Sequence, residues 1–345
     1  MKGSVIALDT YKGRMAAAQI VDGKLTDLLV EPPEGVVLPG AIFRAICDRP
    51  LKGQGGMMLR LPGGRSAFLR QGKGLKPGER VLVQVTGFGD DGKAVPVTQK
   101  VLFKSRYAIV TPGAPGINVS RSIRDEEARV RLLEVAHEVM QGGEEGLIIR
   151  SVAANADLDE VAEDIAAMLD LSRAVLADAD GDAELLVEGP DPHELAWREW
   201  PEADQLDADT GAFERHNVHE MVASTRGALV RLTGGATMFV EPTRALVAVD
   251  VNTGADTSAA AGLKANIAAA RALPAALKTR GLGGQVVIDF APCPKKDRRQ
   301  VEQVLRAALK ADGIETAMVG WTQLGLFELQ RKRERLPLSR CLEGQ

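Results

Sequence analysis

The sequence predicts an α+β protein with more than one domain, and three observations support this. The chain has 345 residues, which is enough for roughly two domains of ordinary size. Between residues 37 and 103, short apolar runs separated by glycine and proline predict a small β-barrel, with an irregular β-meander as the alternative. From Val218 onward, strand patterns alternate with helix patterns, which predicts an α/β layer with a largely buried sheet.

The first half of the chain is predicted to be rich in strands. A β-hairpin is expected at its start, with Asp22-Gly23 as the turn. The helices expected further on show apolar residues at helical spacing. The expected strands are Ser4–Asp9, Met15–Val21, Met57–Leu61, Ala67–Arg70, Arg80–Val85, Val95–Phe103, Tyr107–Thr111 and Gly146–Arg150, and the expected helices are Asp125–Met140 and Leu158–Leu176.

The second half begins with an acidic stretch, residues 178–217, that prolines interrupt. It predicts a loop-rich connector with one strand at Glu184–Val187. Beyond it, helices are expected over Val218–Arg226, Gly262–Arg280, Lys296–Ala311 and Leu324–Arg335, and strands over Ala228–Leu232, Thr237–Glu241, Ala245–Val251, Gln285–Phe290 and Thr316–Gly320. The last helix would carry a run of basic residues, which indicates either phosphate contacts or a solvated helix face.

The composition excludes several classes of protein. Lys and Arg number 43 against 47 Asp and Glu, so the net charge of −4 argues against a globally basic nucleic-acid coat but allows a local basic groove. Three cysteines without paired ligand spacing argue against a disulfide framework and a structural zinc. No apolar run approaches the roughly 18 residues of a membrane span, and the apolar stretch at the start is too short for a signal peptide. A cytoplasmic protein without membrane association is expected.

Two aspartates stand out by their context. Asp250 and Asp289 each close an apolar strand pattern, where ionised carboxylates are rare unless they are paired or bind a metal. Because ligands gather outside the carboxyl ends of strands in open α/β sheets, both side chains are expected on one rim. Asn252 falls on the same strand face as Asp250. These oxygen ligands suit Mg²⁺ or Mn²⁺; the alternative is that each aspartate caps a turn or helix.

The stretch around these residues resembles the catalytic region of the ribonuclease E/G family. The resemblance rests on residues 241–254 (EPTRALVAVDVNTG), on Lys264-Ala-Asn266, on residues 280–290 (RGLGGQVVIDF) and on residues 324–333 (LGLFELQRKR). Weaker similarity runs from Gly92-Lys93 through Ser105–Gly113 and Val119–Arg121 to Gly146–Ser151. Most of the chain is covered, with a gap at residues 178–217.

The resemblance implies a fold of four parts. They are an RNase H-like piece in two segments (1–36 and, shortened and serving as a connector, 161–217), an S1-like β-barrel (37–103), a 5′ sensor-like region (104–160) and a DNase I-like α/β catalytic domain (218–345). It also implies that Asp250 and Asp289 match the family's Mg²⁺ ligands. Asn252 matches an asparagine that orients the first of these aspartates or the scissile phosphate.

Further residues match binding positions of the family. Arg121, Arg150 and Ser151 match a 5′-phosphate pocket, in which Ser151 replaces the usual threonine. Without the resemblance, Arg150 would be expected to pair with a carboxylate of the acidic helix at 157–164. Phe68 and Lys93 match RNA contacts of the S1 barrel, but the aromatic residue that the family has in the strand matching Met57–Leu61 is absent.

The expected function is therefore that of a Mg²⁺-dependent endoribonuclease. It would prefer single-stranded RNA, leave 5′-phosphate and 3′-hydroxyl ends, and serve RNA processing or decay. The paired-cysteine zinc link that joins protomers in larger members is absent, so any homo-oligomer would form without it. Two alternatives remain open, namely a non-catalytic RNA-binding protein that kept the fold and a Mg²⁺ nuclease acting on DNA.

Overall fold

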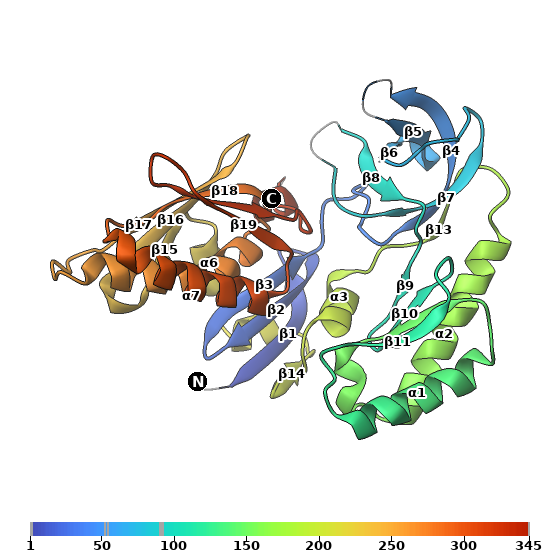
Figure 1. Cartoon of the computed structure of the whole chain (residues 1–345), viewed down its shortest axis with the longest axis horizontal. Coiled ribbons are helices and arrows are strands. Elements are labelled where there is room, and N and C mark those ends of the chain that lie inside the picture. The colour runs from blue at the N-terminus through green and yellow to red at the C-terminus, as the bar shows by residue number, and fades with distance from the viewer. Residues whose placement is uncertain (1–2, 52, 54, 90–92, 344–345) are drawn as a thin grey trace. The chain divides into compact units, whose positions relative to one another are not determined.

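The structure is a computed structural model that describes residues 3–51, 53, 55–89 and 93–343. It divides into two compact units, one built from residues 1–36 and 202–345 and the other from residues 37–201. Figure 1 shows the elements of both units. None of the helices in the described parts of the chain is long and apolar enough to cross a membrane. Gly92, which belongs to the weaker similarity, lies outside the described residues.

The continuous unit, residues 37–201, begins with a closed five-stranded barrel. The strands follow the order β4-β5-β6-β8-β7, and β7 pairs back with β4. Phe43, Leu59 and Val83 are buried inside and alternate with outward side chains. The barrel strands are β4 (Ile42–Leu51), β5 (Gly56–Arg60), β6 (Ser66–Leu69), β7 (Arg80–Val85) and β8 (Val95–Thr98); the 3₁₀ turn η1 (Pro62–Gly64) joins β5 to β6, and β13 (Glu184–Val187) pairs with β4. The predicted barrel is confirmed.

The rest of this unit is a four-stranded sheet packed against helices. The order is β11-β12-β10-β9, and β11 runs parallel to β12. Asp125 and Asp157 begin α1 and α2 by accepting backbone hydrogen bonds, and both helices bury an apolar face in one core. The elements are β9 (Phe103–Lys104), β10 (Ala108–Thr111), β11 (Gly116–Val119), α1 (Glu126–Met140), β12 (Gly146–Ile149), the 3₁₀ helix η2 (Ser151–Asn155), α2 (Leu158–Ala177) and α3 (Pro192–Glu199).

The discontinuous unit contains a smaller and a larger sheet. The smaller sheet has the order β14-β1-β2-β3, and β14 runs parallel to β1. Phe213, Val222 and Leu338 fill its core, so the beginning, middle and end of the chain meet there. Its elements are β1 (Ser4–Tyr11), β2 (Arg14–Val21), β3 (Lys24–Val30), β14 (Gln205–Asp207), α4 (Ala212–Arg215), α5 (Val218–Thr225) and α8 (Leu338–Cys341).

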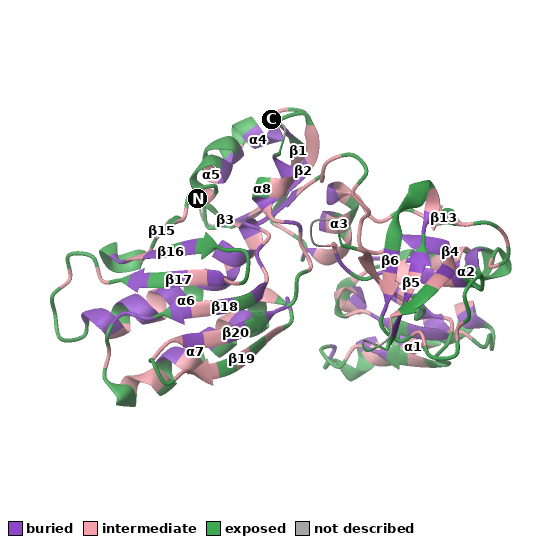
Figure 2. Cartoon of the chain, turned by 90° about the horizontal axis from the view of Figure 1, so that it is seen from above, coloured by how far each residue is buried: buried purple, intermediate pink, exposed green. Residues whose placement is uncertain are grey.

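The larger sheet has six strands in the order β15-β16-β17-β18-β20-β19, in which only β17 and β18 pair in parallel. Its core is shared with two helices, α6 and α7. Buried strand residues such as Val249 and Ile288 alternate with exposed ones, as the banding of β17 and β18 in Figure 2 shows. The elements are β15 (Leu229–Arg231), η3 (Thr233–Gly235), β16 (Thr237–Pro242), β17 (Val247–Asn252), α6 (Ala261–Thr279), β18 (Gly284–Asp289), η4 (Lys295–Asp297), α7 (Arg298–Asp312), β19 (Thr316–Trp321) and β20 (Phe327–Arg331).

The expectation of a largely buried sheet is therefore wrong. Among the described residues, α6 and α7 cover one face of the larger sheet, and the side chains of the other face remain exposed or half-buried. The apolar strand patterns suggested burial on both faces because their outward positions include apolar residues, Ala248 and Val287. An open face is also where a large ligand can reach a strand end without displacing a helix.

A row of buried charges joins the two sheets of this unit. Arg331, 1% exposed, forms an ion pair with Asp312 at 2.6 Å. Lys278 reaches Asp312 at 2.9 Å and Asp27 at 3.9 Å, and Arg335 binds Asp27 at 2.9 Å. Because a buried charge is costly unless it is paired, these ion pairs connect β3, α6, α7, β20 and the segment after β20 in one arrangement.

Two predictions at the ends of the chain are wrong. The turn of the first hairpin is Lys12-Gly13, with φ of 52° and 75°, and Asp22-Gly23 joins β2 to a third strand. The segment Leu324–Arg335 is not a helix, because Phe327, Leu329 and Arg331 are buried at alternate positions and form β20. The basic residues obscured this period of two. The sequence patterns also gave no indication of β3, β4, β11, β14, α3, α4 and α8.

A side chain at Gly262 is expected to destabilise the larger sheet. A Cβ atom there would meet the carbonyl oxygen of Pro292, on the segment that follows β18. Alanine normally stabilises a helix relative to glycine by about 1 kcal/mol, yet we expect Gly262→Ala to lower the free energy of unfolding by about 1–3 kcal/mol. Urea unfolding of the full chain measures this. The control is Gly227→Ala, whose nearest contact would be at 3.8 Å; equal effects of both variants would contradict the expectation.

Candidate active site

Asp250 and Asp289 lie side by side on the open face of the larger sheet. They are register partners at the ends of the parallel strands β17 and β18, and neighbouring strands are about 4.8 Å apart. Both side chains are exposed, whereas Val249 and Ile288 point into the core on the other face. The structure thus brings together the two carboxylates that the sequence singled out.

Asn252 completes this group from the same face of β17. Its Nδ2 donates a hydrogen bond to Oδ2 of Asp250 at 2.7 Å, which orients that carboxylate. Neither Asp250 nor Asp289 accepts a hydrogen bond from the backbone of any described residue. Neither carboxylate therefore acts as the turn or helix cap that was the structural alternative.

A buried asparagine to which the sequence analysis gave no role holds the chain just beyond Asp289. The side chain of Asn266 in α6 is fully buried, donates to the carbonyl oxygen of Ala291 at 2.8 Å and accepts from the Ala291 amide at 2.9 Å. Ala291 lies two residues after Asp289, so α6 determines where β18 ends. A signal existed in the sequence, since an asparagine on an apolar helix face needs buried partners.

The donor set can be compared with the needs of a metal ion. Among the described residues, no three or more Asp, Glu, His or Cys side chains are close enough to enclose a metal. Asp250, Asp289 and Asn252 instead offer two carboxylates and one amide on an open face. Magnesium usually keeps several waters and is bound through one or two carboxylates plus substrate phosphates. The residues therefore fit a hydrated Mg²⁺ and do not fit an enclosed structural metal.

The three residues that match the 5′-phosphate pocket differ in their exposure. Val119 and Ile149 are register partners in the parallel strands β11 and β12. Arg121 and Ser151 each follow two residues later, so they lie beyond adjacent strand ends, and both are exposed. The side chain of Arg150, in contrast, is only 18% exposed.

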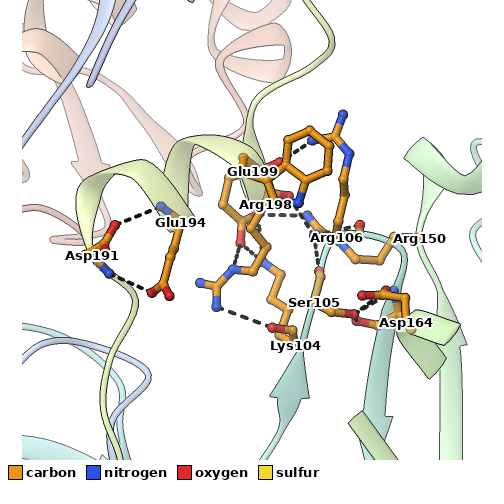
Figure 3. A network of polar contacts seen from close by, with 11 residues as sticks. Lys104, Ser105, Arg106, Arg150, Asp164, Asp191, Glu194, Arg198 and Glu199 are labelled. Atoms are coloured by element: carbon orange, nitrogen blue, oxygen red, sulfur yellow. Dashed lines mark hydrogen bonds and ion pairs between the residues drawn. The ribbon is translucent and has the colours of Figure 1, made fainter. Parts of the chain in front are cut away.

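Arg150 is held by the polar network drawn in Figure 3. Its Nη1 donates to the carbonyl oxygens of Ser105 at 2.6 Å, Arg106 at 3.1 Å and Arg198 at 2.9 Å, and its Nη2 donates to Glu199 at 2.8 Å. Arg150 is thus bound to α3 and not to the acidic helix that was the alternative. The guanidinium of Arg150 thus makes four hydrogen bonds to other residues of the protein.

The acidic helix contributes to the same network through another residue. Asp164 accepts hydrogen bonds from the Ser105 hydroxyl at 2.5 Å and from the Tyr107 amide at 3.0 Å. Arg106 places its guanidinium 4.1 Å from the ring centre of Trp197, and its Nη1 donates to the carbonyl of that residue. These contacts fix α3 on the sheet formed by β9, β10 and β12.

Glu199 lies where three cations meet. Its carboxylate contacts Lys104 at 2.7 Å and both Arg150 and Arg198 at 2.8 Å. Burial alone would raise the pKa of Glu199, but the hydrogen bond and charge of Lys104, together with both arginines, hold the pKa below its usual value. Burial lowers the pKa of Lys104, and Glu199 opposes this. One carboxylate facing three cations leaves a local excess of positive charge.

The two predicted RNA contacts of the barrel lie on its outer surface. Phe68 is half-buried between its register partners Met58 in β5 and Pro96 in β8, and its ring covers Gly56. Lys93 is exposed two residues before β8. Phe68 is thus the aromatic side chain of this surface patch, because β5 itself carries none.

The basic run near the C-terminus is largely used within the protein. Arg331 and Arg335 form the buried ion pairs with Asp312 and Asp27 described above. Lys332 forms an ion pair with Glu334 at 2.9 Å. The predicted helix is therefore wrong, and two arginines of the run face inward; phosphate contact by the rest of the run stays a prediction.

The chain is similar to proteins of known families. The model of the ribonuclease E/G family matches residues 103–208 and 195–334. Ribonuclease E of Synechocystis sp. is 29% identical over 301 residues, which is 75% of this chain and 44% of that protein. Ribonuclease G of Escherichia coli (strain K12) is 30% identical over 313 residues, and ribonuclease G of Haemophilus influenzae is 27% identical over 306, each match covering 78% of this chain and 62% of the relative. The chain therefore matches less than two thirds of the length of each.

Removing the charge of Glu199 is expected to destabilise the unit 37–201. Glu199→Gln leaves three cations without their carboxylate, which should cost about 2 kcal/mol at neutral pH. Because the folded pKa lies below the unfolded value of about 4.3, this stabilisation is fully present above that value and is lost as pH falls through the folded pKa.

Urea unfolding of the wild type and the variant from pH 7 down to pH 3 measures this difference. Glu163→Gln, at an exposed position of α2, is the control and should change little at any pH. A difference between Glu199→Gln and wild type that does not shrink in acid would contradict the assignment of the stabilisation to the Glu199 charge.

Proposed function

The chain belongs to the ribonuclease E/G family, and from this membership we propose that it is a metal-dependent endoribonuclease acting on single-stranded RNA in RNA processing or decay. The membership also confirms the resemblance recognised in the sequence. The observation that carries the proposal is the in-register pair of exposed carboxylates, Asp250 and Asp289, on an open sheet face.

The proposed cofactor is Mg²⁺, with Mn²⁺ as a substitute, held by Asp250 and Asp289. When bound, such an ion neutralises phosphate charge and lowers the pKa of a water that attacks phosphorus. Hydrolysis of this kind would leave 5′-phosphate and 3′-hydroxyl ends. The two-carboxylate donor set with room for water and phosphate supports this choice.

Residues of the chain would prepare the site in two ways. Asn252 keeps the Asp250 carboxylate in one orientation through its 2.7 Å hydrogen bond. Asn266 fixes the position of Ala291 and thereby the end of the strand that carries Asp289. Both contacts exist before substrate arrives, so less ordering is needed when a phosphate approaches.

We further propose that the parts of the chain correspond to those of the family. The closed barrel supports an S1-like domain, and the sheet with α1 and α2 would be the 5′ sensor. The pairing of β1 with β14 joins residues 1–36 to the region near residue 205, as an RNase H-like piece in two segments requires. The larger sheet with α6 and α7 would be the DNase I-like catalytic domain.

Single-stranded RNA would be bound by several surfaces. Phe68 would stack against a base and Lys93 would contact phosphate on the barrel. With few aromatic residues in the chain, phosphate contacts should provide most of the affinity. Binding should then weaken steeply as salt is added.

Arg121, Arg150 and Ser151 would bind a 5′-terminal phosphate. The exposed Arg121 and Ser151 lie at adjacent strand ends, and charge-assisted hydrogen bonds to phosphate are strong. Since Glu199 occupies Nη2 of Arg150, a terminal phosphate would compete with a carboxylate for this guanidinium. We therefore expect Arg121 and Ser151 to make the first contacts.

A second candidate function is RNA binding without catalysis. It is favoured by the engaged state of Arg150 and by the lack of an aromatic side chain in β5. The paired carboxylates favour the catalytic candidate. A Mg²⁺ nuclease acting on DNA is a third possibility that matched RNA and DNA substrates separate.

Replacing either carboxylate is expected to abolish cleavage. Asp250→Asn or Asp289→Asn leaves too few hard ligands for a weakly held ion, so cleavage of a 5′-labelled single-stranded RNA with Mg²⁺ should fall by at least about a hundredfold. EDTA should have the same effect on the wild type. Folding and RNA binding should be retained, as measured by circular dichroism and filter binding.

Glu241→Gln, on the same open face, is the matched control and should stay active. A matched DNA strand shows whether the activity is specific for RNA. Full activity of either aspartate variant would refute the metal assignment, and RNA binding without any cleavage by the wild type would favour the second candidate.

The 5′-end proposal predicts a preference for substrates with a 5′-monophosphate over those with a 5′-hydroxyl. Arg121→Ala and Ser151→Ala should reduce this preference, and because both residues are exposed these variants should keep the fold. The ratio of kcat/KM for the two substrates measures the preference. Equal cleavage of both substrates by the wild type would show that no sensor operates, while leaving the catalytic site untouched.

A further inference from the structure

Two exposed apolar side chains, Phe239 and Leu229, lie beside the paired carboxylates. Phe239 in β16 is the register partner of Leu229 in β15 on one side and of Asp250 in β17 on the other. The three strands are neighbours in the larger sheet (Figure 2). Phe239 is 37% exposed and Leu229 is 38% exposed.

The ring of Phe239 is not part of the hydrophobic core. Met238 and Val240, on either side of Phe239, are 0% and 1% exposed and belong to the core on the covered face. Side chains alternate along a strand, so Phe239 points to the opposite face, where Asp250 and Asn252 lie. Among the described residues, nothing buries the ring fully, although burial of a phenylalanine is favourable.

We propose that Phe239, flanked by Leu229, is a stacking site for the nucleobase next to the scissile phosphate. This inference rests on the proposed function. Directly opposed residues in antiparallel strands have Cβ atoms about 4.5–5.5 Å apart. Phe239 and Asp250 are such a pair, so the ring and the carboxylate are neighbours on this face. A base is joined to the phosphate through its ribose, so a phosphate held at Asp250 and Asp289 brings a flanking base to this ring.

The chemistry of the Phe239 ring also determines which nucleobases this site would favour. A phenylalanine ring offers no hydrogen-bond donor or acceptor, so it stacks on every base and favours the larger purine rings modestly. The site would therefore position the strand without reading a strict sequence. It would also partly compensate for the absence of an aromatic residue in β5 of the barrel.

Abasic substrates test the proposal directly. A set of single-stranded RNAs, each lacking one base near the cleavage position, is cleaved by the wild type and by Phe239→Ala. One abasic position should lower kcat/KM of the wild type by on the order of tenfold. Phe239→Ala should lose a similar factor on the intact RNA and show no further loss at that abasic position.

Conservative variants show whether the aromatic ring or only the size of the side chain at position 239 matters. Phe239→Tyr should retain the rate, and Phe239→Leu should behave like Phe239→Ala. Val319→Ala is the control, because Val319 is 64% exposed on the far edge strand β19. The proposal is overturned if Phe239→Ala cleaves like the wild type, or if the abasic penalty persists in it. A different outcome would be that the mass of the wild type in solution rises with concentration, that Phe239→Ala abolishes this rise, and that cleavage is unchanged. Phe239 and Leu229 would then contact a second copy of the chain instead of a base.

A binding measurement separates this inference from the proposed function. If the wild type cleaves no RNA, the proposed function fails, and 2-aminopurine placed along the RNA still reports stacking. Its fluorescence should be quenched on binding to the wild type at one position and not on binding to Phe239→Ala. Equal fluorescence with both proteins at every position would overturn the stacking site.

Discussion

The parallel pairing of β17 with β18 is the constraint on which the rest of the active face depends. Because strand side chains alternate, a slip of one residue in this register would turn Asp289 or Asp250 toward the core. The connection between the two strands contains α6, which packs on the covered face and holds the chain beyond β18 through Asn266. The positions of the two carboxylates are thus set by backbone pairing and by one buried amide. Neither carboxylate accepts a hydrogen bond from the backbone of any described residue, so both stay exposed on the open face, as the proposed metal site requires.

One-sided burial of the larger sheet separates stability from function. The covered face contains aliphatic side chains from the strands, α6 and α7, while the open face carries carboxylates, an amide and a half-exposed ring. Substitutions on the open face can therefore change substrate contacts with little effect on packing. The 5′ region is organised differently, because Arg150 and Glu199 both hold α3 in place and belong to the matched phosphate pocket or its neighbourhood. There, a substitution at a residue matched to the pocket would also change how α3 is held.

Local patterns predicted four of the five barrel strands, much of the α/β alternation and the strand-end aspartates, because each is visible within a few residues. Features that depend on distant partners were missed. The sequence around Arg331 shows a basic run, and only its partner Asp312 in α7 explains why this arginine is buried in a strand. Likewise, the helix that carries Glu199 lies in a stretch that prolines make look irregular, although Asp191 and Glu194 form a capping box there. The exposure of Phe239 depends on which sheet face the helices cover, and strand alternation alone does not determine this.

The discontinuity of one unit has a consequence for synthesis on the ribosome. Residues 37–201 form a continuous unit that can fold once residue 201 has emerged, whereas Asp27 in β3 must wait for Arg335. At about 5–20 residues per second, the remaining 134 residues (335 − 201) take roughly 7 to 27 seconds to make. The edge of β1 lacks β14 from the time that β1 is made until residue 207 appears, and an unpaired strand edge invites wrong pairing. Although they are made first, the N-terminal strands are therefore among the last segments of the chain to reach their final partners.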